Sequence, residues 1–134
     1  MARFRRKLVW ERAQYRCEYC HLPQIWSFLP HEIDHIRARK HHGPTTLHNT
    51  CLACACCNGA KGTNVAGYDP ESGDLAPLFN PRVDLWSEHF VWEGPLLLGL
   101  TPQGRVTIDV LNINDPNRLE HRRLLLASGD WTTS

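Results

Sequence analysis

The chain has 134 residues, which is enough for one domain and too few for a second independent core. Its apolar runs stay far below the ~18 residues that a membrane-spanning helix needs, and no secretory signal follows the basic start Met1–Lys7. The overall net charge is +1. We therefore expect a cytoplasmic protein that folds as a single domain over residues 1–134 and has no membrane partner.

The first half of the chain predicts a helix followed by two short strands. Residues 5–17 contain good helix formers and neither Gly nor Pro, which predicts a basic N-terminal helix. Residues 31–36 and 50–53 are typical of two strands, and the loop between them contains Gly43-Pro44. A helix is expected to start near Asn58 and to stop near Gly67.

The second half predicts a surface connection, a hairpin and helices. Residues 68–77 are rich in Asp, Gly, Pro and Ser, whereas 90–93 and 96–100 flank Gly94-Pro95 as in a hairpin. Thr101-Pro102 is a helix start signal, although residues 106–110 alternate as a strand would. Asp115-Pro116 is a second start signal, which predicts a helix over 119–127.

Four cysteines form two Cys-x-x-Cys pairs, and two further cysteines lie near the second pair. Cysteines at this spacing can place both sulfurs on one tetrahedral zinc ion. Without a secretory signal, zinc is favoured over three disulfides. Cys56 competes with Cys57 for the ion, Cys51 is expected to pack as a small apolar side chain, and His21 is an alternative ligand. The expected structural zinc ligands are Cys17, Cys20, Cys54 and Cys57.

The two halves of the chain carry opposite charge. Residues 1–61 have a net charge of +6 and residues 62–134 have −5. A basic half would attract a polyanion such as DNA through its phosphates. The alternative is that the acidic half simply folds against the basic half.

The segment from Cys17 to Gly62 resembles the HNH endonuclease family. The matching elements, in order, are Cys17-x-x-Cys20, Ile33-Asp34-His35-Ile36, the Gly-containing loop, Leu47-His48-Asn49 and Cys54-x-x-Cys57-Asn58-x-x-Lys61-Gly62. The resemblance implies an α+β fold with a small ββα-metal nuclease core at 17–62, clamped by the zinc ion that the four paired cysteines would bind. Residues 78–127 would form a hairpin and helix extension that packs on this core and could support a homodimer.

The family's chemistry then assigns roles to the motif residues. His35 would be the general base, because a neutral imidazole can accept a proton from water near neutral pH. Asp34 and Asn58 would hold one catalytic Mg²⁺ or Mn²⁺, since carboxylate and amide oxygens suit hard cations. Asn49 would brace the loop and orient the histidine. Structural alternatives are that Asn58 only caps a helix and that the Asp-His pair belongs to an ordinary strand.

Four basic residues of this segment are candidates for DNA contact: Lys61, Arg37, Arg39 and Lys40. Each could instead be a solvated surface charge. The sequence therefore predicts a metal-dependent endonuclease that hydrolyses DNA phosphodiester bonds by nicking or double-strand cleavage. The alternative is a catalytically inactive zinc-binding module that binds nucleic acid or a protein partner.

Overall fold

The computed structural model describes residues 3–133 as a small mixed α and β protein, so Met1 and Ala2 of the basic start lie outside the described residues. The chain divides into two compact units. Within the described residues, the first unit comprises 3–65 and Asn80–Asp84, and the second comprises Ala66–Phe79 and 85–133. A single domain over 1–134 stays a prediction, as does an extension at 78–127 that packs on the core.

The first unit begins with α1 (Arg6–Arg12), which is shorter than the helix expected over 5–17. The chain leaves the helical conformation after Ala13, because Gln14 and Tyr15 both adopt positive φ angles. Val9 faces the interior and is fully buried. The Arg12 guanidinium donates hydrogen bonds to the Leu47 and Thr50 carbonyl oxygens, both at 2.8 Å, and so ties α1 to the start of the second strand.

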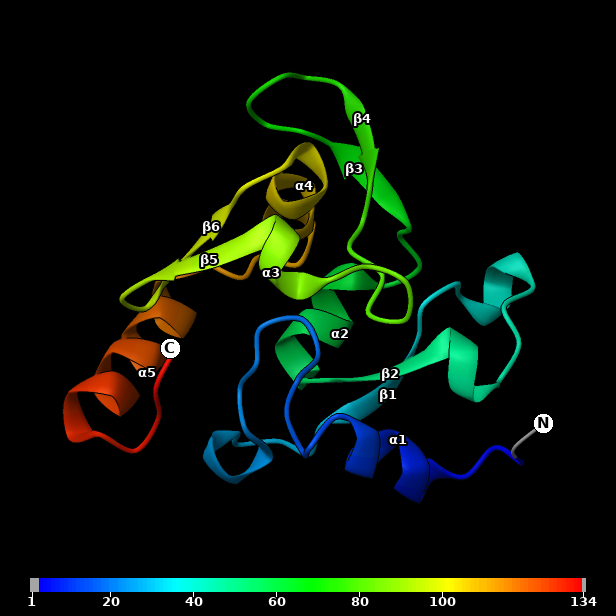
Figure 1. Ribbon diagram of the computed structural model, residues 1–134, viewed down its shortest axis with the longest axis horizontal. Coiled ribbons are helices and arrows are strands. Elements are labelled where there is room, and N and C mark those ends of the chain that lie inside the picture. The colour runs from blue at the N-terminus through cyan, green and yellow to red at the C-terminus, as the bar shows by residue number, and fades with distance from the viewer. Residues whose placement is uncertain (1–2, 134) are drawn as a thin grey trace. The chain divides into compact units, whose positions relative to one another are not determined.

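The centre of this unit is an antiparallel hairpin of β1 (Glu32–His35) and β2 (Thr50–Ala53), close to the two strands expected from the sequence. Its register places Asp34 opposite Cys51 and His35 opposite Thr50. All four residues of β2 are buried. Figure 1 shows α1 and α2 (Ala55–Lys61) on either side of this hairpin. Three short 3₁₀ turns complete the unit: η1 (Gln24–Trp26), η2 (Arg39–His41) and η3 (Leu47–Asn49).

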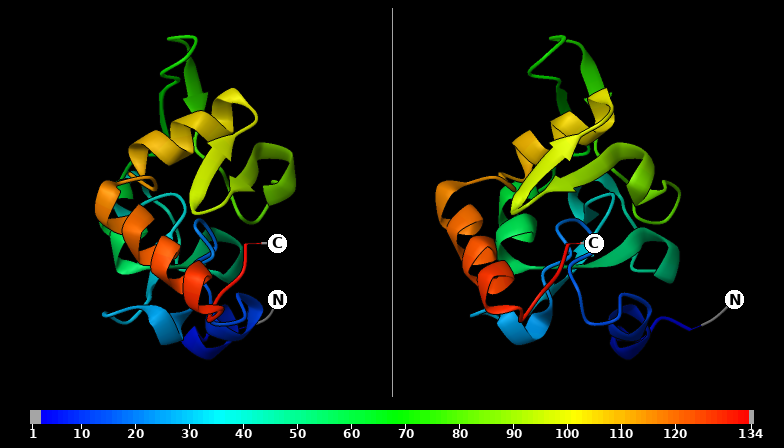
Figure 2. Two further views of the ribbon diagram at one scale, coloured as in Figure 1. Left: turned by 90° about the vertical axis from the view of Figure 1, so that its left-hand side faces the viewer. Right: turned by 60° about the vertical axis from the view of Figure 1, so that its left-hand side comes forward.

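The second unit is built from two hairpins and three helices among the described residues. In chain order its elements are β3 (Ala66–Tyr68), β4 (Leu75–Pro77), α3 (Trp86–His89), β5 (Phe90–Glu93), β6 (Leu96–Gly99), α4 (Pro102–Val110) and α5 (Pro116–Ser128). Figure 2 shows α4 next to the β5–β6 hairpin, where it contacts β6. Gly99 and Gly104 allow this approach, because a Cβ on Gly104 would overlap the His89 carbonyl oxygen.

The start signals in this half are confirmed, and the expectation of a mere surface connection at 68–77 is wrong. The Thr101 hydroxyl accepts from the Gly104 amide at 3.0 Å, and the Asp115 carboxylate accepts from the Asn117 amide at 3.0 Å. Residues 106–110 are helical despite their alternation, because the cap at Thr101 and burial of Val106 and Thr107 favour a helix. Residues 68–77 are not merely a connection, since they contribute strands to the β3–β4 hairpin.

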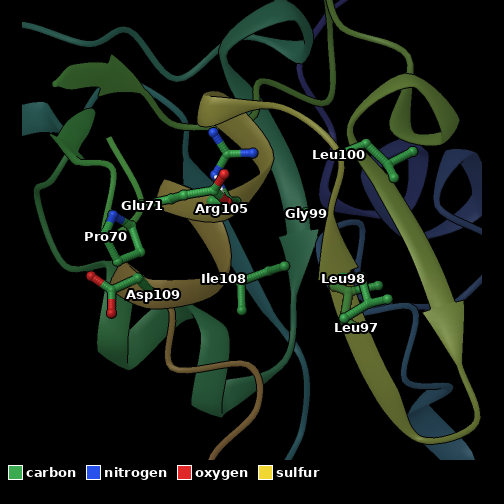
Figure 3. A pocket seen from close by; sticks show the side chains of 9 residues that line it. All are labelled: Pro70, Glu71, Leu97, Leu98, Gly99, Leu100, Arg105, Ile108 and Asp109. Atoms are coloured by element: carbon green, nitrogen blue, oxygen red, sulfur yellow. Dashed lines mark ion pairs between the residues drawn. The ribbon is translucent and has the colours of Figure 1, made fainter. Parts of the chain in front are cut away.

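A cleft of about 490 Å³ lies within the second unit (Figure 3). Its wall combines the apolar side chains of Leu97, Leu98 and Ile108 with the charged side chains of Arg105 and Asp109. Among residues 3–133, no helix has both the length and the apolar character needed to cross a membrane.

Candidate functional site

The four paired cysteines converge within the first unit. The sulfur atoms of Cys17, Cys20, Cys54 and Cys57 all lie within 4.8 Å of one another. All four side chains are buried, and burial raises the pKa of the Cys17 and Cys57 thiols. A bound metal ion would remove those protons, because metal-coordinated thiols are deprotonated. The cluster has the ligand number and chemistry of a structural zinc site.

Each Cys-x-x-Cys turn is held by its own backbone. The Cys20 amide lies 3.5 Å from the Cys17 sulfur, and the Cys57 amide lies 3.4 Å from the Cys54 sulfur. Cys54 is also the N-cap of α2, so the same residue starts the helix and closes the cluster. The competing Cys56 is exposed and lies outside the cluster.

His35 occupies the last position of β1 and is partly exposed. Its Nε2 atom lies 2.9 Å from the Thr45 hydroxyl, and this hydrogen bond holds one edge of the imidazole ring. Because successive side chains of a strand point to opposite faces, His35 and its neighbour Asp34 meet different surroundings. The imidazole is directed toward Thr45 of the loop that follows β1 and is partly exposed to solvent.

Asn49 holds that loop by three hydrogen bonds from its side chain. Its Oδ1 accepts from the Arg37 amide at 3.0 Å, and its Nδ2 donates to the Arg37 carbonyl at 3.0 Å and to the Pro44 carbonyl at 2.9 Å. The Ile36 amide donates to the Asn49 carbonyl at 2.8 Å. The loop passes very close to itself at Gly43, where a Cβ would overlap the Arg37 carbonyl oxygen.

Asp34 points into the interior and is only 3% exposed. Its Oδ2 accepts a hydrogen bond from the Tyr19 hydroxyl at 2.8 Å, and its Oδ1 accepts from the Lys61 ammonium at 3.1 Å. The Cys51 thiol lies 3.5 Å from both the carboxylate and the Tyr19 hydroxyl. Burial raises the pKa of Tyr19, which keeps its hydroxyl protonated as a donor.

Lys61 is 1% exposed, in contrast to the solvent-facing position that a DNA contact requires. Besides Asp34, its ammonium donates to the His35 carbonyl at 3.1 Å and to the Ile36 carbonyl at 3.3 Å. Its place in the last turn of α2 aims the long side chain along the helix toward the end of β1. In this arrangement Lys61 serves the interior of the unit, and a phosphate would not reach it.

Asn58 and Asp34 both lie at the interface between α2 and β1, and each contacts a different residue there. The Asn58 side-chain amide contacts the carboxylate of Glu32, two positions before Asp34 on the strand. Two carboxylates and one amide are hard oxygen ligands, so this donor set fits Mg²⁺ or Mn²⁺ in chemical type. A cation at Asp34 would share that carboxylate with Lys61.

The remaining predicted contacts lie on the loop after His35. Arg37, Arg39 and Lys40 follow it within five positions, and η2 carries two of them. The Arg37 guanidinium donates to the His42 carbonyl at 3.3 Å. These three cations are exposed on the loop after His35, whereas Lys61 is buried.

Three residues of this site are not among those predicted from the sequence. Thr45 contacts His35, Tyr19 contacts Asp34, and Glu32 contacts Asn58. The period of two along β1 is a signal for Glu32, because it puts that side chain on the same face as Asp34. Tyr19 and Thr45 give no such signal, since their contacts depend on how distant segments close.

Comparisons with known proteins match the part of the chain that contains this site. The model of the family described as HNH endonuclease matches residues 17–64. Septu protein PtuB from Bacillus thuringiensis is 28% identical over 120 residues, which are 88% of this chain and 44% of that protein. The chain therefore spans less than half the length of this curated relative. No solved structure matches the chain. Residues 17–64, which contain the cysteine cluster, the β1–β2 hairpin and α2, are thus the part of the chain that matches the HNH endonuclease family.

Proposed function

We propose that the protein is a metal-dependent endonuclease that hydrolyses phosphodiester bonds of DNA, with His35 as the general base. The observation that carries this proposal is the setting of His35, partly exposed at the end of β1 with Nε2 2.9 Å from the Thr45 hydroxyl. A positioned imidazole can accept the proton that an attacking water loses. Asn49 supports the role by holding the loop that follows that ring.

Asp34 and Asn58 are the proposed ligands of a catalytic Mg²⁺ or Mn²⁺. They lie on facing surfaces of β1 and α2, and both offer oxygen atoms. When bound, such an ion would stabilise the charge that develops on the phosphate and on the departing oxygen.

We assign a separate zinc ion to the cysteine cluster, with a structural role. Its four ligands come from the turn before η1 and from the start of α2, so one ion joins segments that are distant in sequence. Structural zinc contributes folding free energy directly, on the order of 10 kcal/mol in zinc-finger peptides. The zinc would therefore hold α2, which carries Asn58, in place.

DNA would approach over the loop that follows β1. Arg37, Arg39 and Lys40 provide cations there for phosphate contacts. Such contacts orient a nucleic acid without reading its bases, so they favour a general phosphate interface. A cytoplasmic location and a homodimer through residues 78–127 stay predictions.

A plasmid cleavage assay tests the proposed function. The purified zinc-loaded protein should nick or linearise plasmid with Mg²⁺ or Mn²⁺ and should be inactive after these ions are chelated. His35→Ala should lower kcat by about 10² to 10⁴-fold, the usual contribution of a general base. His48→Ala removes an exposed imidazole from η3 and serves as the matched control, with the wild-type rate expected.

Two outcomes would contradict the proposal. Full-rate cleavage by His35→Ala would exclude this residue as the base. Absence of cleavage by the folded wild-type protein with either ion would favour a zinc module that binds nucleic acid or protein without hydrolysis.

A further inference from the structure

A buried ion pair joins α2 to the strand end that carries His35. The Lys61 ammonium lies 3.1 Å from Asp34 Oδ1, and the two side chains are 2% and 4% exposed. A charge in such surroundings is tolerated only when it is paired and hydrogen-bonded. The ammonium also donates to the carbonyl oxygens of His35 and Ile36, so its three N–H groups meet three acceptors.

Those three acceptors surround the proposed base along the chain. Asp34 precedes His35, and the His35 and Ile36 carbonyls follow its side chain in the backbone. A single side chain from α2 therefore holds the strand immediately before and after the imidazole. Because Lys61 uses its donors here and is buried, phosphate contact is not its role in this arrangement.

The same carboxylate also connects the strand to the cysteine cluster. Tyr19 lies between the ligands Cys17 and Cys20, and its hydroxyl donates to Asp34 Oδ2 at 2.8 Å. Lys61 lies on the helix that contains Cys57. Tyr19 and Lys61, two of the partners of Asp34, thus come from segments that the cluster fixes.

We propose that Lys61 is a positioning residue of the nuclease, and that its buried ammonium sets the backbone of residues 34–36 and thereby the orientation of His35. This inference rests on the proposed function for the role of His35. Effective catalysis requires the base to be held within about 0.5 Å of its productive position. An ammonium with three fixed acceptors on this short segment restrains it more tightly than the strand ladder alone, because β1 ends at His35.

The test combines kinetics with hydrogen exchange in the zinc-loaded full chain. Lys61→Met keeps the length of the side chain and removes its charge and donors. We expect kcat for plasmid cleavage to fall by about 100-fold, the effect of roughly 1 Å of misplacement. The Kd for a DNA duplex, measured with Ca²⁺ or without divalent ions, should stay within about threefold of the wild type.

Exchange of the Ile36 amide gives a readout independent of activity. This amide donates to the Asn49 carbonyl at 2.8 Å, next to a carbonyl that Lys61 holds. In Lys61→Met it should exchange roughly 10-fold faster or more, because local opening no longer breaks a charge-assisted hydrogen bond. Amides of α1 should keep their wild-type rates.

Lys40→Met is the matched control, since it removes the same charge from an exposed position in η2. It should weaken DNA binding and reduce the log–log salt slope by about one, as expected for a phosphate contact. Its Ile36 exchange should equal that of the wild type. Lys61→Met should show the opposite pattern, with an unchanged salt slope.

Lys61→Arg keeps the positive charge that pairs with Asp34. It is the test variant if Lys61→Met does not fold. Its guanidinium cannot place one nitrogen against all three acceptors, so kcat should fall and Ile36 exchange should rise at an unchanged Kd. For the variant that folds, an Ile36 rate within about threefold of the wild type would overturn the proposal. A loss confined to Kd would overturn it as well. If the wild type cleaves no DNA, the proposed function fails and the Ile36 rate alone decides whether Lys61 positions this strand.

Discussion

Replacing Tyr19 by Phe would remove one buried hydroxyl and leave the ring in place. The hydroxyl donates to Asp34 Oδ2 at 2.8 Å, and Tyr19 is fully buried. A hydrogen bond to a charged group contributes about 1.5–3 kcal/mol, and the buried carboxylate has little access to water that could replace the lost donor. The Cys51 thiol at 3.5 Å is a weak donor and compensates little. We therefore expect a loss of about 2 kcal/mol in the free energy of unfolding.

Urea denaturation of the zinc-saturated protein would measure this loss. With an m value of about 1–3 kcal/mol/M, a change of about 2 kcal/mol lowers the midpoint by roughly 1 M. Tyr15→Phe is the control, because it removes a hydroxyl from an exposed residue of the same unit and should shift the midpoint little. A Tyr19→Phe midpoint equal to that of the wild type would refute the reasoning that the buried Asp34 carboxyl group depends on this donor.

Two further predictions concern the cysteine cluster and the second unit. Cys57→Ser should reduce bound zinc, measured by mass spectrometry under native conditions, and should destabilise the first unit, whereas Cys56→Ser should retain the metal because Cys56 lies outside the cluster. Asp69→Asn removes a carboxylate whose pKa is held well below its usual range. The main cause is the pair of hydrogen bonds from Arg105, at 2.8 and 2.9 Å. Hydrogen bonds from the Glu71 amide and the Ser72 hydroxyl lower the pKa further. Because the folded-state pKa is lowered, the wild type should be more stable than Asp69→Asn at pH 7, and this margin should shrink as the pH falls below about 4 in thermal unfolding scans. A constant margin from pH 7 down to about pH 2 would argue against ionised Asp69 as its source.

The elements that the sequence predicts best have local signals. Both strands of the β1–β2 hairpin, the β5–β6 hairpin and the helix starts at Thr101 and Asp115 follow from turn and cap residues within a few positions. The cysteine cluster is also predictable, because its spacing constrains which sulfurs can share an ion. These features need no knowledge of distant contacts.

The features that sequence reasoning misses depend on distant contacts. The position of Lys61 on a short helix predicts an exposed side chain. Lys61 is buried against Asp34 because α2 packs on β1. α1 ends early because the chain must turn at Gln14 and Tyr15, a requirement that good helix formers do not reveal. The aromatic character of Phe28 predicts a core position, yet this residue is 96% exposed.

The position of Tyr19 between two cysteines of the cluster limits how the segment that carries His35 can be transplanted. A chimera built from the β1–β2 hairpin and α2 alone would leave the Asp34 carboxylate without its phenolic donor. The smallest segment that can be transferred with these contacts intact therefore begins at Cys17, ahead of the hairpin, and extends through Lys61. Grafting experiments on other scaffolds would have to import this preceding turn together with the strands it serves.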